Sequence, residues 1–198
     1  KVKKFDPGYY GSRETIQFSG LHNRLNIVMT HSFGLHQCPL DQLKRTDLLV
    51  IFNGFLQFHP VAAQYKRRSR LIVQQMINKL EDQPHKVLQD FIKNCYHPEP
   101  VESVNGQRTI QLNRLLSDLK RLNNEMLNVD ILKQVPRVCI LHGADDAIVP
   151  KAKGRELYEK VNVESYYYEI QQAGHALPLT HTKKCWSFVK PIIKKYAY

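Results

Sequence analysis

The amino-acid sequence predicts an α/β protein with a mostly parallel β-sheet and helices on both of its faces. The first observation is a set of four short runs of apolar, β-branched and aromatic residues, at 25–30, 47–52, 137–143 and 165–170. The second is that segments with helical spacing separate these runs, an alternation typical of parallel sheets. The third is the length of 198 residues, which is enough to bury a core in one compact domain.

The first part of the chain is expected to supply two strands and the turns around them. Asp-Pro-Gly at residues 6–8 is a turn signal, and the run 25–30 predicts a strand buried on both faces. After Ser32 the pattern is helical, with Pro39 in or after the helix. The run 47–52 predicts a second buried strand, which ends in the turn Asn-Gly-Phe.

The middle of the chain changes from strand patterns to helical ones. Helices are expected at 61–82, 84–94 and 110–127 because apolar residues recur there at intervals of three and four. In the first of them, the side expected to face inward carries Ala62, Tyr65, Ile72, Val73, Met76, Ile77 and Leu80. Because these helices interrupt the strand pattern, residues 61–128 are predicted to form a helical cap on a core of residues 1–60 and 129–198.

Strand patterns return in the last third of the chain. The run 137–143 predicts a strand that ends in a glycine, followed by a helix at 151–160 after Pro150. A further strand is expected at 165–170 and a last helix at 182–195. This order completes the alternation of strands and helices.

Composition narrows the class of partner and compartment. Lys and Arg number 29 against 18 Asp and Glu, a net charge of +11, which favours an anionic partner or only a soluble basic surface. The sequence contains no nucleic-acid-binding motif, no apolar run long enough to span a membrane, no signal-peptide pattern and no metal-site spacing. Its four cysteines lie far apart, so a reduced cytoplasmic protein is expected.

Three polar residues follow three of the predicted strands, at the edge where parallel sheets bind ligands. They are Ser32, Asp146 and His175. A serine hydroxyl needs an imidazole to take its proton during attack, and a carboxylate then orients and stabilises that imidazole. The sequence therefore predicts a catalytic triad with Ser32 as nucleophile, His175 as base and Asp146 as acid.

Each of these residues also has an ordinary structural explanation. Ser32 alone fits a helix N-cap, and Asp146 fits a cap for the helix near Pro150. His175 fits a turn position without chemistry. The order of the three, each after a buried strand, favours the triad. His31 is a second imidazole beside the serine, but alternation along a strand predicts that it faces away and serves in packing or hydrogen bonding.

Two turns resemble those of the α/β-hydrolase superfamily, and the resemblance to that superfamily covers nearly the whole chain. "LHGADDAIVP" is similar to its acid turn and "AGHALPLTH" to its histidine turn. The serine turn "THSFG" departs from the usual G-x-S-x-G, because Thr30 occupies the first glycine position. The resemblance implies a serine hydrolase without metal or cofactor, with the Phe33 N–H in the oxyanion hole. The second oxyanion donor and the first strands of the sheet are expected in a segment before Lys1; the alternative is an incomplete oxyanion hole.

Within that superfamily, the chain resembles the small esterases that cleave the methyl ester of pimeloyl-acyl carrier protein in biotin synthesis. The features are "FDPGYYG", "THSFG" and a short helical segment ending at "LHGADDAIVP". The resemblance implies acyl carrier protein as the acidic partner, with Lys66, Arg67, Arg68 and Arg70 as candidate contacts or else a solvated helix face. The alternatives are a lipase-like or thioesterase-like enzyme, or a non-catalytic binding protein with the hydrolase fold.

Overall fold

The computed structural model describes residues 5, 7–12, 14, 25–101 and 109–197. The chain folds into two compact units. The helical unit comprises the described residues of Lys1–Gln17, Gln57–Lys93 and Val101–Glu125, and the sheet unit those of Phe18–Leu56, Asn94–Pro100 and Met126–Tyr198. That residues 61–128 act as a cap over an active site stays a prediction.

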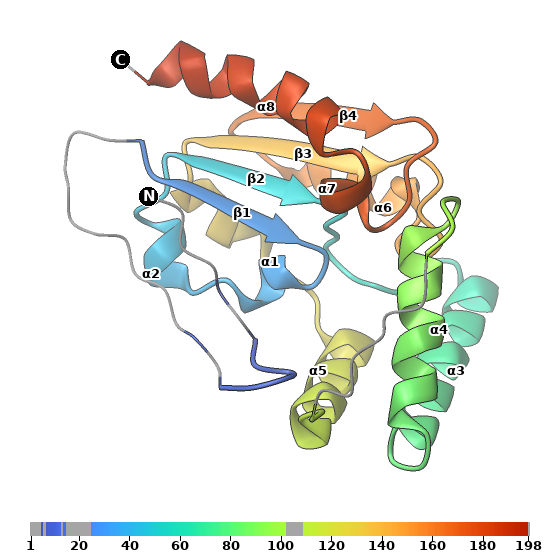
Figure 1. Ribbon diagram of the computed structural model, residues 1–198. Helices are drawn as coiled ribbons and strands as arrows, with labels where there is room; N and C mark the ends of the chain where they lie inside the picture. Colours follow the sequence, from blue (N-terminus) through green and yellow to red (C-terminus); the bar gives the residue numbers. More distant parts are fainter. Residues whose placement is uncertain (1–4, 6, 13, 15–24, 102–108, 198) are drawn as a thin grey trace. The chain divides into compact units, whose positions relative to one another are not determined.

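The sheet unit is built on a parallel β-sheet (Figure 1). In the described residues its strands are β1 (Ile27–His31), β2 (Leu48–Phe52), β3 (Arg137–Gly143) and β4 (Glu164–Ile170), hydrogen-bonded in that order. Ile51 pairs with Thr30 on one side and Ile140 on the other. The predicted parallel sheet is therefore confirmed, and each predicted strand lies within two residues of an observed one.

One face of the sheet is covered by two helices at the end of the chain, α7 (Leu177–Thr180) and α8 (Thr182–Tyr196). Side chains alternate between the faces of a strand, so every second residue of β2 points here. The buried core on this side is Leu48, Val50, Phe52, Cys139, Leu141, Ile170, Ala173, Leu177, Cys185, Val189 and Ile192. Burying this surface fixes α8 against the sheet.

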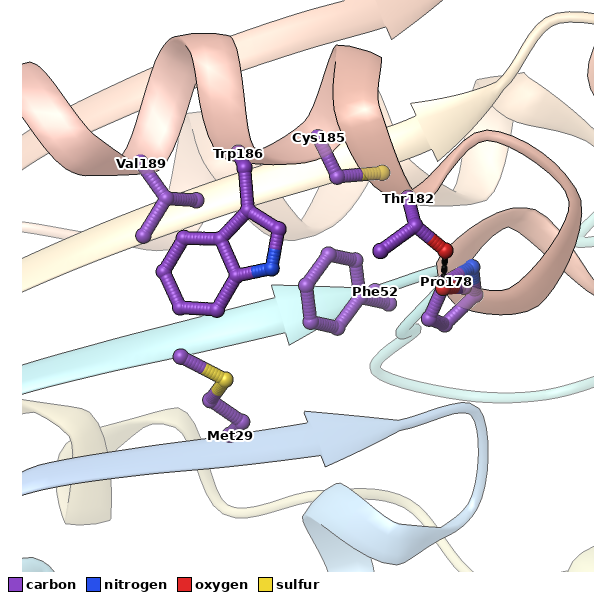
Figure 2. A pocket seen from close by; sticks show the side chains of 7 residues that line it. All are labelled: Met29, Phe52, Pro178, Thr182, Cys185, Trp186 and Val189. Carbon is purple, nitrogen blue, oxygen red and sulfur yellow. Dashed lines mark hydrogen bonds between the residues drawn. The ribbon is translucent and has the colours of Figure 1, made fainter. Parts of the chain in front are cut away.

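An apolar cavity of about 140 Å³ lies on the same face, between side chains of α8 and side chains of β1 and β2 (Figure 2). It is lined by Met29, Phe52, Pro178, Thr182, Cys185, Trp186 and Val189. Met29 is 46% exposed, so the prediction of a first strand buried on both faces is wrong for β1. The reason is that β1 pairs with β2 alone among the described residues and is an edge of the described sheet.

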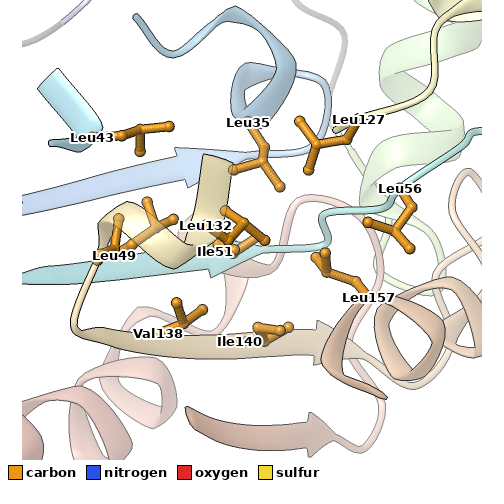
Figure 3. Packing of buried hydrophobic residues seen from close by; sticks show 11 residues of the cluster. Leu35, Leu43, Leu49, Ile51, Leu56, Leu127, Leu132, Val138, Ile140 and Leu157 are labelled. Carbon is orange, nitrogen blue, oxygen red and sulfur yellow. The ribbon is translucent and has the colours of Figure 1, made fainter. Parts of the chain in front are cut away.

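The opposite face carries the second core (Figure 3). Four short elements cover it: α1 (Gly34–Gln37), α2 (Leu40–Leu43), the 3₁₀ helix η1 (Val129–Gln134) and α6 (Lys151–Lys160). Their buried residues Leu35, Leu43, Leu132 and Leu157 pack with Leu49, Ile51, Val138 and Ile140. The segment after Ser32, predicted as helical, divides at Pro39 because proline lacks the N–H that a continuing helix needs.

The helical unit contains α3 (Ala63–Leu80), α5 (Leu112–Asn124) and, as far as Lys93, α4 (Pro84–Tyr96). A buried histidine joins two of them to the preceding loop. His59 accepts a hydrogen bond from the Ser69 hydroxyl at Nδ1 (2.8 Å) and donates one from Nε2 to Asn123 Oδ1 (2.9 Å). Desolvation by burial lowers the pKa of His59, which keeps the neutral form that this pairing requires.

Part of the core expected for the helical unit is wrong. In α3 only Val73 and Leu80 are fully buried, whereas Tyr65 and Ile72 are 58% and 50% exposed. The buried stripe of α3 is narrower than the helical wheel predicts, because α5, the helix in contact with α3, covers only one side of it. No helix among the described residues is both long and apolar enough to cross a bilayer.

The position of the core in β3 gives a direct test of this packing. Ile140→Ala should lower the free energy of unfolding by about 2–5 kcal/mol. The Ile140 side chain has no exposed surface, so its truncation leaves a cavity in the core. Leu179→Ala, at a side chain 69% exposed, should change it by less than about 0.5 kcal/mol. Urea unfolding followed by circular dichroism measures both. Equal losses in the two variants would contradict the assigned core.

Candidate active site

Ser32 occupies a strained turn between β1 and α1. Its backbone φ is 55°, in the left-handed region that costs a non-glycine residue about 1–3 kcal/mol. Its N–H donates to the Phe52 carbonyl at 2.9 Å, which extends the β1–β2 pairing to the turn. The N-cap residue of α1 is Phe33, and no side chain caps this helix, so the N-cap explanation for Ser32 is wrong. A strained serine between a strand and a helix is typical of a nucleophile.

Thr30 takes the place of the first glycine in the usual serine turn. Its side chain is buried, 7% exposed, and its Oγ1 has no hydrogen-bond partner among the residues that the structure describes. Because a buried hydroxyl without a partner is unfavourable, the turn accommodates the side chain at a cost in stability.

Asp146 lies in the turn after β3 and uses both of its carboxylate oxygens. Oδ1 accepts the backbone N–H groups of Ile148 and Val149, each at 2.8 Å. Oδ2 accepts from His175 Nδ1 at 2.7 Å. The N-cap of α6 is Pro150, without a side-chain cap bond, so Asp146 does not cap that helix. The turn thus fixes one oxygen and presents the other to the histidine.

A second buried histidine, His142, stabilises the turn that carries Asp146. His142 has no exposed surface, and its Nε2 donates to the Val149 carbonyl at 2.8 Å. Desolvation by burial lowers its pKa, so it stays neutral although Asp146 Oδ2 is only 3.8 Å away. His142 therefore holds the turn in place and leaves the carboxylate charge to His175.

His175 is buried in the turn after β4, and its backbone is held on several sides. Its carbonyl accepts hydrogen bonds from His31 Nε2 and Asn53 Nδ2, both at 2.8 Å. The next residue, Ala176, donates its N–H to the Cys95 carbonyl at 2.7 Å. A side chain at Gly174 would collide with the His97 carbonyl, which explains the glycine before the histidine.

The structure brings two of the three predicted catalytic residues into direct contact. Asp146 and His175 are hydrogen-bonded, whereas no hydrogen bond joins the Ser32 hydroxyl to His175 in the described part of the chain. His31, adjacent to Ser32, packs against His175 with ring centroids 4.8 Å apart. Catalytic hydrogen bonds are often formed only when substrate is present, so this geometry is compatible with a triad.

His31 has the packing and hydrogen-bonding role that was expected for it. Desolvation of its ring and the neighbouring His175 lower the pKa of His31 to about 4, although the residue as a whole is exposed. It is therefore neutral at neutral pH, with Nε2–H as the donor to the His175 carbonyl.

The remaining candidates lie in different parts of the chain. Phe33, whose N–H is the expected oxyanion donor, begins α1, and its ring stacks on those of His36 and Phe55. The basic candidates all lie on α3: Arg67, Arg68 and Arg70 are exposed and Lys66 is half-buried. Successive helical residues point about 100° apart, so these four side chains surround much of α3 instead of forming one face.

Two features of the site were not predicted from the sequence. Asn53 was assigned only to a turn, and the segment around Cys95 only to a helix end and loop. Asn53 has no exposed surface and a φ of 50°, and its carboxamide contacts both the acid strand and the histidine turn. The available signal was an asparagine directly after a buried strand, because asparagine tolerates left-handed backbone better than most residues.

Cysteine and metal chemistry find no support in the described residues. No group of three or more His, Cys, Asp or Glu there is arranged to hold a metal ion. All four cysteines are free, and desolvation by burial raises their pKa values. The thiols are therefore protonated at neutral pH and are weak nucleophiles.

Comparison with known proteins identifies the fold. An esterase from Exiguobacterium antarcticum superposes with a TM-score of 0.68 over 84% of this chain and 65% of its own, at 17% sequence identity. A thermophilic esterase from Thermogutta terrifontis gives 0.63 over 88% and 66% at 12% identity. The chain has the α/β-hydrolase fold. A bromoperoxidase from Bacillus anthracis shares this hydrolase fold, with a TM-score of 0.63 over 86% and 68% at 15% identity.

The other comparisons do not narrow the class of hydrolase. No family model matches the sequence, and no curated protein matches it. The chain spans about 65% of the length of the Exiguobacterium esterase. At these low identities the likeness shows the fold alone, and the fold does not determine the reaction.

The buried Thr30 hydroxyl, which has no hydrogen-bond partner among the described residues, gives a test of the serine turn. Thr30→Val should raise the free energy of unfolding by about 1 kcal/mol, since it removes a buried hydroxyl that lacks a partner. The matched control is Thr46→Val, because the buried Thr46 hydroxyl donates to the Gln42 carbonyl at 2.7 Å. That change should cost about 1 kcal/mol. Urea unfolding measures both free energies. An equal decrease in the free energy of unfolding in the two variants would contradict the described environment of Thr30.

Proposed function

We propose that the protein is a serine hydrolase that cleaves acyl esters. The observation that carries this proposal is the buried 2.7 Å hydrogen bond between His175 Nδ1 and Asp146 Oδ2, at the sheet edge where Ser32 occupies a strained turn. In the proposed site, His175 oriented by Asp146 is the base and Ser32 is the nucleophile. Esterases are also among the solved structures that share the fold.

In the proposed reaction, the Ser32 hydroxyl attacks the ester carbonyl while His175 Nε2 takes its proton. The Phe33 N–H donates to the oxyanion of the tetrahedral intermediate. Collapse breaks the bond to the alcohol oxygen, which receives the proton from His175 and leaves. A water molecule, deprotonated by the same histidine, then attacks the acyl-enzyme. The bond from the acyl carbon to Ser32 Oγ breaks, His175 returns the proton to that oxygen, and the carboxylic acid is released.

The surroundings of His175 orient its ring for this reaction. Donation from Nδ1 to Asp146 fixes the tautomer that leaves Nε2 free to accept the serine proton. The carboxylate then stabilises the imidazolium. The neighbouring imidazoles of His31 and His142 have lowered pKa values and are neutral at neutral pH, so they do not repel that imidazolium.

For the substrate, we propose the methyl ester of pimeloyl-acyl carrier protein, in a cytoplasmic role in biotin synthesis. The support is the resemblance of "FDPGYYG" and "THSFG" to the esterases of that reaction, together with the net charge of +11. A basic protein attracts an acidic carrier through long-range electrostatics. The exposed Arg67, Arg68 and Arg70, with Lys66, are the proposed contacts.

The nucleophile is tested with a short p-nitrophenyl ester and a fluorophosphonate probe. Ser32→Ala should lower kcat on the order of 10⁶-fold and abolish labelling. Ser32→Gly should have the same effect while relieving the left-handed strain, which separates chemistry from folding. Ser187→Ala, at an exposed serine of α8, is the matched control and should keep activity and labelling.

The outcomes separate the classes of function. A wild-type protein that neither hydrolyses esters nor reacts with the probe would contradict the proposal and favour a non-catalytic binding protein. Labelling with a preference for thioesters or long acyl chains would keep the hydrolase and replace the substrate by that of a thioesterase-like or lipase-like enzyme.

The proposed carrier contact is tested by reversing charge on α3. Replacing Arg67, Arg68 and Arg70 by Glu should raise KM for the carrier-bound ester by about tenfold or more and leave a small free ester unaffected. The matched control replaces three exposed lysines of α8, Lys183, Lys190 and Lys194, by Glu, which changes the net charge equally. Equal effects of the two triple variants would contradict a specific contact on α3.

A further inference from the structure

Asn53 ties together the two turns that carry the candidate acid and base. It follows β2, and its N–H donates to the Leu141 carbonyl at 2.9 Å, one step beyond the β2–β3 pairing. Its side-chain Oδ1 accepts the Gly143 N–H at 3.0 Å, at the end of β3. Its Nδ2 donates to the carbonyls of Gly174 and His175, at 3.1 and 2.8 Å. One buried carboxamide therefore joins three segments that are far apart in the chain.

The backbone at Asn53 is specialised for this bridge. With φ at 50°, the residue bends away from the line of β2, so its side chain lies between the acid strand and the histidine turn. The two turns approach so closely that a side chain at Gly143 would collide with the carbonyls of Ala173 and Gly174. A residue in this gap needs left-handed backbone, one acceptor and two donors, and asparagine supplies all of these.

We propose that Asn53 is a positioning residue that, together with His31, sets the place of His175 relative to Asp146 and Ser32. The His175 carbonyl receives one hydrogen bond from each of the two side chains. The ring of the same residue is held by Asp146. With backbone and ring both anchored, the direction in which Nε2 points is determined. A displacement of about 1 Å in such a base costs on the order of 100-fold in rate, so the anchor matters for the reaction.

The kinetic role rests on the proposed esterase function, while the positioning itself does not. Removing the carboxamide leaves the His175 carbonyl with His31 alone and leaves the Gly143 N–H without its acceptor. Neither the His175 carbonyl nor the Gly143 N–H is expected to contact substrate, so the loss of the Asn53 carboxamide should not weaken substrate binding. The signature of positioning is therefore a loss in kcat with KM retained, together with a change in the hydrogen bond between His175 and Asp146.

The experiment compares Asn53→Gly with Gln172→Gly. Both positions have left-handed backbone, with φ values of 50° and 60°, so glycine fits each without strain. Gln172 is exposed and serves as the matched control. Two measurements are made on each purified variant: steady-state hydrolysis of p-nitrophenyl butyrate, and the NMR resonance of the proton that His175 Nδ1 donates to Asp146. A hydrogen bond to a carboxylate places this proton far downfield.

Asn53→Gly should lower kcat about 10- to 100-fold with KM changed less than about threefold, and should shift or broaden the His175 Nδ1 proton beyond detection. Gln172→Gly should match the wild type in both measurements. If Asn53→Gly does not fold, Asn53→Asp replaces it, because that change keeps the size and the acceptor for Gly143 and loses the amide donors.

The failures of the two proposals are distinguishable. An inactive wild type with a resonance that moves only in Asn53→Gly would contradict the esterase and support the positioning. An active wild type, with unchanged kcat and resonance in Asn53→Gly, would overturn the positioning. Unfolding of both Asn53 variants would assign a purely structural role and would also overturn it.

Discussion

The chemistry proposed for this protein depends on a buried hydrogen bond between a carboxylate and an imidazole. The bond joins His175 Nδ1 to Asp146 Oδ2 at 2.7 Å, and the surrounding structure directs each partner toward it. Two backbone N–H groups occupy the other oxygen of Asp146, so the carboxylate has one orientation. A charge this deeply buried is stable only when it is hydrogen-bonded on all sides, which explains the density of polar contacts around it.

The parallel sheet explains how distant residues reach this place. Strands that run in one direction end at one edge, so the turns after β1, β3 and β4 are neighbours although more than a hundred residues separate Ser32 from Asp146. Gly143 lets the turns after β3 and β4 approach more closely than a side chain would allow, and Gly174 does the same for the histidine turn and the segment at His97. Packing of apolar residues on both faces keeps the edge rigid, and a rigid edge is what a preorganised site requires.

The sequence predicted the strands and the order of the candidate residues because both follow from local patterns. The runs at 137–143 and 151–160 coincide with β3 and α6, since apolar periodicity and Pro150 define them without tertiary information. The exposure of Tyr65 and Met29 was not predictable in this way, because it depends on which neighbour covers a face. Asn53 was also missed. Its role comes from contacts with Gly143 and His175, which are remote in sequence, and a turn pattern carries no record of them.

The central claim is that Asp146 and His175 activate Ser32, and the chain supplies a matched pair of carboxylates for its test. Asp145 is exposed beside the buried Asp146. The measurement is the rate at which a fluorophosphonate labels Ser32 in Asp146→Asn and in Asp145→Asn. Asp146→Asn should slow labelling on the order of 10⁴-fold, because the amide no longer selects the histidine tautomer, and Asp145→Asn should label at the wild-type rate. Equal labelling of the two variants would contradict the account.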